Sequence, residues 1–116
     1  MRPGLWNPGR LLWWPRSRRS YQRALELNPY SPAVLFDVGA FYARVGDAAF
    51  ASQMFEAVLR IAPDNPAALV SLGELQLADP AQADSGKEHL RRAIGVAPGS
   101  PAAKRARELL GEAPGA

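Results

Sequence analysis

Apolar residues along most of this chain recur at the spacing of a helix, and no stretch alternates between apolar and polar with a period of two. The pattern is clearest over residues 35–45, 50–61, 69–75 and 90–94. Residues three and four apart share one face of a helix, so these runs predict amphipathic helices and no strand.

The ends of the predicted helices are marked by polar residues, glycine and proline. Three candidate N-caps directly precede a proline: Ser31, Asn65 and Ser100. A serine or asparagine there accepts a hydrogen bond from the first turn, and a proline at the first helical position loses no backbone bond. Gly46 and Asp47 predict the end of one helix and the cap of the next. The marks together predict antiparallel hairpins over residues 32–62 and 66–97.

The chain also repeats. Pro32, Ala33, Leu35 and Gly39 return 34 positions later as the same residue types, at Pro66, Ala67, Leu69 and Gly73. Leu25 and Pro29 return in the same way as Leu59 and Pro63. A fixed period of this length is typical of a stacked repeat architecture.

The repeat resembles the tetratricopeptide family in its period and in its pattern of bulky and small residues. The matching positions of the first full repeat are Leu35, Val38, Gly39, Tyr42, Gly46, Ala51, Phe55, Val58 and Pro63. Two features depart from the family: Gln76 stands where tyrosine is usual, and one extra residue falls within 78–86. The resemblance implies an all-α fold of antiparallel helix hairpins, stacked in a short right-handed solenoid.

This resemblance divides the chain into parts. We expect a half repeat over 17–29, full repeats over 32–65 and 66–100, and a capping helix over 101–111, which together make a helical repeat domain over 17–111. We expect residues 1–16, rich in Trp, Pro and Gly, to be disordered, and residues 112–116 to form a tail.

Two glycines stand inside predicted helices, where glycine costs about 1 kcal/mol relative to alanine. We interpret both as places where two helices approach closely. Gly39 is expected to face Ala51, and Gly73 to face either Ala83 or Gly86. On this interpretation leucine at position 39 would be strongly destabilising and alanine would be tolerated.

Charge is concentrated at the N-terminus. Residues 1–25 hold six arginines and no acid, whereas residues 26–116 hold eight basic and eleven acidic residues, a balance of 8 − 11 = −3. We interpret the N-terminal segment as a flexible tail, or as the truncated start of a longer array. The alternative is a basic-tailed adaptor that tethers the repeats to nucleic acid or to an anionic membrane surface.

The sequence shows no residues of catalytic or cofactor-binding type at the required spacing. His89 is the only histidine and there is no cysteine, so we expect no metal site and no cofactor. His89 is expected on a solvated helix face, and we expect no enzymatic activity. No apolar run reaches the roughly 20 residues that a membrane span requires, and the lack of cysteine fits a reducing compartment, so we expect a cytoplasmic protein.

The resemblance places a protein-binding groove on the first helix of each hairpin. The residues expected to line it are Ala33, Phe36, Ala40, Ala43, Arg44, Ala67, Val70, Glu74, Leu77, Ala102 and Arg105. Chaperone-binding members grip a terminal carboxylate with Lys, Asn and Arg, but here those positions hold Phe36, Ala40, Ser71, Ala102 and Ala106. We therefore expect no such clamp. The predicted function is a scaffold or adaptor that binds an apolar helix or extended segment of another protein.

The N-terminal edge of the array is a second candidate contact surface. The helix around Tyr21, Leu25 and Leu27 has no preceding helix, and we expect its outer face to lack polar capping residues. Either the apolar patch over residues 11–14 folds back over this face, or the face is exposed and drives self-association.

Overall fold

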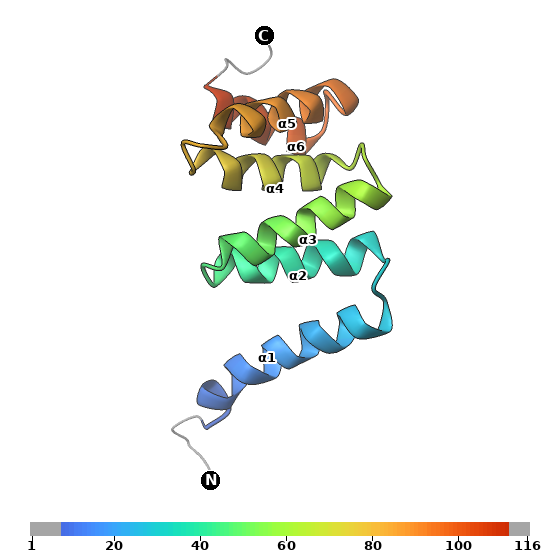
Figure 1. The fold of residues 1–116 in the computed structure, drawn as a ribbon, viewed down its shortest axis with the longest axis vertical. Helices are drawn as coiled ribbons and strands as arrows, with labels where there is room; N and C mark the ends of the chain where they lie inside the picture. The colour runs from blue at the N-terminus through green and yellow to red at the C-terminus, as the bar shows by residue number, and fades with distance from the viewer. Residues whose placement is uncertain (1–7, 112–116) are drawn as a thin grey trace.

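The protein is described here by a computed structural model, which places residues 8–111. The helices are α1 (Pro8–Leu27), α2 (Pro32–Arg44), α3 (Ala48–Ile61), α4 (Pro66–Leu77), α5 (Ala83–Val96) and α6 (Pro101–Leu110). No strand occurs within residues 8–111, which confirms the all-helical prediction. The chain runs from α1 at one end of the long axis to α5 and α6, which overlap at the other end, in a body that measures 56 × 29 × 29 Å (Figure 1).

The polar residues expected to begin the helices do so. Side-chain oxygens of Ser31, Asn65 and Ser100 accept hydrogen bonds from backbone amides three residues on, at 3.3, 3.1 and 3.1 Å. Asp47 caps α3 in the same way, at 3.1 Å from the amide of Phe50. Gly46 precedes it with a φ of 93°, a left-handed conformation that glycine adopts without strain. These local signals explain why α2, α3, α4 and α6 begin where the sequence predicts.

Consecutive helices run back and forth, so the connections fall on two opposite edges. The turns α1–α2, α3–α4 and α5–α6 lie on one edge, and α2–α3 and α4–α5 on the other (Figure 1). The α4–α5 loop, residues 78–82, is longer than the α2–α3 turn and takes up the extra residue of the second repeat. Within it Asp79 accepts a hydrogen bond from the amide of Ala81 at 3.0 Å.

The core is apolar and runs through the stack. Its largest fully buried side chains are Phe55, Leu69, Leu72, Leu90, Val38 and Val58. One cluster joins α2, α3 and α4, and a second joins α4, α5 and α6 through Leu69, Leu90 and Ala106. Since clusters cross every pair of neighbouring helices from α2 onward, no helix of this part is held by its own hairpin alone.

The two mid-helix glycines lie at close helix approaches, but the nearest neighbour of Gly39 is Phe55 rather than the expected Ala51. A Cβ at Gly39 would lie 2.8 Å from the ring of Phe55, which supplies the three nearest atoms. The reason is size, because the flat phenylalanine ring fills the space that the missing side chain leaves. Gly73 does face Gly86: a Cβ on either glycine would lie within 2.9 Å of the other's carbonyl oxygen.

The first helix begins earlier than expected. The composition of residues 1–16 predicts disorder, whereas α1 starts at Pro8 and continues unbroken to Leu27. Proline fits the first turn of a helix, and the Arg, Leu and Trp that follow are compatible with one. Pro15 lies in its interior and removes one backbone hydrogen bond. Residues 1–7 and the expected tail, residues 112–116, lie outside the described part of the chain.

Helix α1 packs on α2 through aromatic contacts. The ring of Tyr21 lies 4.6 Å from that of Phe41, and the guanidinium of Arg18 lies 5.5 Å from the ring centre of Tyr42. The exposed residues from Arg19 onward are Arg19, Ser20, Gln22, Arg23, Glu26 and Leu27. All but Leu27 are polar, so the expectation of an outer face without polar residues is wrong for this stretch. Its apolar residues face α2 instead.

Candidate functional site

A hollow of about 350 Å³ lies between the first helices of the two hairpins. Its lining comes from α2, α3 and α4: Ala40, Ala43, Arg44, Phe55, Ser71, Glu74 and Leu75. We call these seven residues the groove. Small alanines on α2 leave the space open, and they and Leu75 give it an apolar surface above the buried ring of Phe55.

The structure brings four of the eleven predicted site residues together in this groove. They are Ala40, Ala43, Arg44 and Glu74. A fifth, Arg105 on α6, reaches the same place by its contact with Glu74. The predicted residues that lie together are therefore those of the C-terminal half of α2 and the middle of α4.

The other six predicted residues lie elsewhere. Ala33 and Ala67 are exposed in the first turns of α2 and α4, and Phe36 packs on the Phe55 ring with 5.3 Å between ring centres. Val70 is only 7% exposed and belongs to the core, where Leu77 and Ala102 pack against the same cluster. Phe36, Val70, Leu77 and Ala102 therefore contribute to the packing between helices, whereas Ala33 and Ala67 are exposed outside the groove.

Sequence reasoning missed Phe55, Ser71 and Leu75 as lining residues. Ser71 and Leu75 could have been found, because they lie three residues before and one after Glu74 and so share or border its helix face. Phe55 comes from the second helix of the hairpin. It lines the groove because Gly39 lacks a side chain and lets the ring lie against the backbone of α2.

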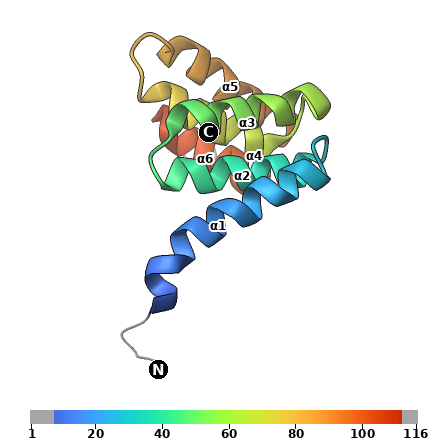
Figure 2. The same ribbon diagram turned by 60° about the horizontal axis from the view of Figure 1, so that its bottom comes forward.

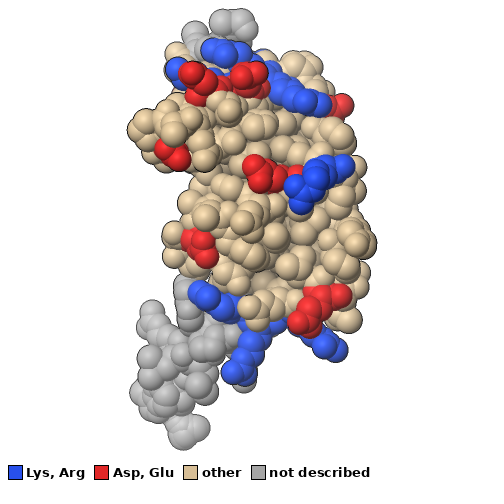
Figure 3. Space-filling model, viewed as in Figure 1, with Lys and Arg blue, Asp and Glu red and all other residues tan. Residues whose placement is uncertain are grey.

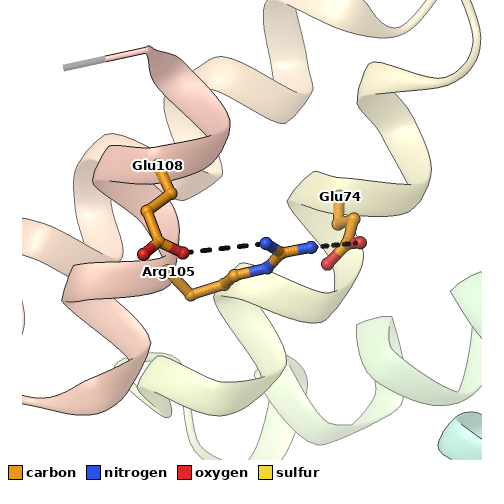
Figure 4. A network of polar contacts seen from close by, with 3 residues as sticks. All are labelled: Glu74, Arg105 and Glu108. Carbon is orange, nitrogen blue, oxygen red and sulfur yellow. Dashed lines mark hydrogen bonds and ion pairs between the residues drawn. The ribbon is translucent and has the colours of Figure 1, made fainter.

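The rims of the groove are charged. On α4, Glu74 accepts a hydrogen bond from Arg105 at 3.1 Å, and Arg105 also lies 3.7 Å from Glu108 (Figure 4). All three side chains are about half exposed, so the contacts add little stability and mainly set where the charges stand. On α2, Arg44 is exposed, and none of the ion pairs within residues 8–111 includes it.

His89 is not on a solvated face as expected. It is half-buried, and with its proton on Nδ1 it donates a hydrogen bond of 2.7 Å to Oε1 of Gln76. Gln76 is 8% exposed and is the residue that replaces the usual tyrosine. The two side chains therefore satisfy each other between α4 and α5, which assigns His89 a structural contact.

Replacing His89 with alanine should lower the free energy of unfolding by about 1–3 kcal/mol, because the buried amide oxygen of Gln76 would lose its partner. The double variant Gln76→Leu/His89→Leu should cost clearly less, since no polar atom is then stranded. Urea unfolding of both variants checks this, and equal losses would contradict it.

Two further hollows lie on the surface of the C-terminal hairpin. One of about 500 Å³ is bounded by the α5–α6 turn and the start of α6, and one of about 420 Å³ lies along α5 beside His89. Each is lined by a single helix or by one helix and its turn, so neither is a cleft between packed elements. The groove is smaller, but three helices build it.

Within residues 8–111 no three or more His, Cys, Asp or Glu side chains come close enough together to hold a metal ion. Over the same range, no helix has the length and apolar character to cross a bilayer.

Comparison with known proteins gives one partial similarity. No model of a protein family matches the chain. The chain is 35% identical over 95 residues to the Protein CTR9 homolog of Arabidopsis thaliana, an alignment that covers 79% of this chain and 8% of that protein. The chain therefore spans only 8% of the length of this relative.

Proposed function

We propose that the chain is a tetratricopeptide-like helical repeat, stacked as a short right-handed solenoid, that binds a segment of another protein in the groove between α2 and α4. The observation that carries the proposal is the groove itself, which three helices build from small and apolar residues. The all-helical fold and the partial similarity to the CTR9 homolog are consistent with a role in protein interaction.

The lining indicates the chemistry of the partner. Ala40, Ala43 and Leu75 offer an apolar strip, and the ring of Phe55 lies beside it. Arg44 stands exposed on one rim, and Glu74 on the other is already engaged by Arg105. An amphipathic helix or an extended apolar segment fits this surface, with an acidic side chain at the rim of Arg44.

The role we propose is non-enzymatic and needs no cofactor. Binding at a groove of this kind requires only apolar contact area and complementary charges at the rim, and both are present. The positions of the chaperone-type clamp hold none of its Lys, Asn and Arg residues, so a free terminal carboxylate is not the expected ligand.

The test is selection of binding peptides from a displayed random library, followed by measurement of their affinity. We expect the selected peptides to carry apolar residues three or four apart. Ala43→Arg, which places a long charged side chain in the groove, should weaken their binding at least about tenfold, the equivalent of about 1.4 kcal/mol.

The matched control is Ala49→Arg, at an exposed position in the first turn of α3 outside the groove. It adds the same side chain and the same charge and should leave the affinity unchanged. Peptides that bind both variants equally well would show that the groove is not the binding site.

A further inference from the structure

The N-terminal helix is far more basic than the rest of the described chain. Helix α1 contains five arginines, no lysine and one acid, Glu26. Residues 28–111, by contrast, hold eight basic and nine acidic residues. Glu26 offsets little of this charge, because it lies 3.9 Å from Arg23 with both side chains about 70% exposed (72% and 70%). A positive field therefore belongs to one helix at one end of the molecule.

The arginines of α1 whose surroundings the structure describes have different roles. Arg18 lies against the ring of Tyr42 and takes part in the packing of α1 on α2. Arg19 and Arg23 are exposed, and they lie four residues apart, so they stand one above the other on the same face of the helix. In Figure 3 basic side chains gather at this lower end of the molecule.

The exposed face is open to a long ligand. Figure 2 shows that α1 extends past the stacked helices α2–α6 toward its N-terminal end, so only its C-terminal half is backed by α2. The residues that pack on the body are Tyr21 and Leu25, on the side of the helix away from Arg19 and Arg23. At 1.5 Å per residue the backbone of α1, 20 residues in all, is about 30 Å long.

We propose that this outer face of α1, the surface around Arg19 and Arg23, binds the phosphate backbone of a single-stranded nucleic acid. Guanidinium groups pair with phosphate oxygens through two parallel hydrogen bonds and also stack on unpaired bases, which ammonium groups do not. Arginine is the only basic residue type in α1. Because a polymer of carboxylates has no bases to stack on, a single-stranded nucleic acid is the better ligand for this helix. Between Arg18 and Leu27 this face does not suit insertion into a bilayer, because Leu27 is the one exposed apolar residue of that stretch.

The test is fluorescence anisotropy of the full chain with a labelled oligothymidylate, measured between about 50 and 200 mM salt. The affinity should fall as salt rises. The double variant Arg19→Gln/Arg23→Gln should reduce the steepness of the slope of log K against log salt by about 1.4, since each lost contact to a single strand contributes about 0.7. At about 0.1 M salt that corresponds to roughly 25-fold weaker binding.

The control variant Lys87→Gln/Arg91→Gln removes the same charge from exposed positions of α5 and should bind almost as the wild type does. Far-UV circular dichroism of both variants checks that they remain folded. Equal weakening by the control, or equal affinity for a duplex or for polyglutamate of the same length, would overturn the proposal. So would binding to phosphatidylserine vesicles without binding to the oligonucleotide.

Discussion

Replacing Gly86 with alanine is expected to lower the free energy of unfolding by about 3 kcal/mol. The new Cβ would lie 2.8 Å from the carbonyl oxygen of Gly73 and 3.0 Å from the backbone nitrogen of Leu77. Both atoms belong to the backbone of α4, which cannot move aside without separating the two helices. Overpacking of this kind costs about 1–3 kcal/mol or more, and a clash with backbone belongs at the upper end.

Gly95 provides the control on the same helix. A Cβ there would meet nothing within 4 Å, and the residue is exposed. Gly95→Ala should therefore raise the stability by up to about 1 kcal/mol through better helix propensity. Urea unfolding should therefore show a lower free energy of unfolding for Gly86→Ala and a higher one for Gly95→Ala. A stable Gly86→Ala protein would mean that α4 and α5 do not cross there.

Leucine at position 39 is expected to be at least as damaging, with a loss of several kcal/mol, about 3 or more. Even the first carbon of the side chain would lie 2.8 Å from the ring of Phe55, which is 1% exposed and cannot swing out. The ring is held further by Phe36 at 5.3 Å between centres. The structure also changes the expectation for Gly39→Ala, which should now be destabilising rather than tolerated.

A double-mutant cycle tests the cause. If the ring is the obstacle, Gly39→Ala should cost less in a Phe55→Leu background, where no ring occupies the space left by the glycine, than in the wild type. The difference in unfolding free energy between the two backgrounds measures the coupling. If Gly39→Ala costs the same in both backgrounds, its destabilising effect does not come from contact with Phe55.

The sequence predicted the helices well because their signals are local. Ser31, Asn65 and Ser100 each act on an amide three residues away, so the cap can be recognised without knowing the fold. The position of the extra residue in the second repeat could also be predicted, since a loop is where an insertion is tolerated. The start of α1 could not, because Pro and Gly near residues 8 and 9 argue equally for a helix start and for disorder.

Contacts between helices were predicted less well than the helices themselves. Gly39 is a small residue at a crossing, but whether alanine or a phenylalanine ring fills the space depends on the rotation of α3, which no local signal encodes. The burial of Val70 could not be predicted for a similar reason, because it depends on how the helices pack. This residue occupies the helix position 34 residues after Phe36, yet it is buried in the core because α6 packs against it. The hollow in the structure therefore lies against the helices that the sequence suggested, but only four of the eleven predicted residues line it.

The loop at residues 78–82 has a practical consequence for measuring what this protein binds. All five of its residues are exposed, and the turn is held by its own backbone through bonds from Asp79 to Gln76 and from Gln82 to Asp79. Because the chain has no cysteine, Ala81→Cys would introduce a single thiol. A fluorophore attached to that thiol would stand outside both the groove and α1, so it could report either kind of binding without taking part in it.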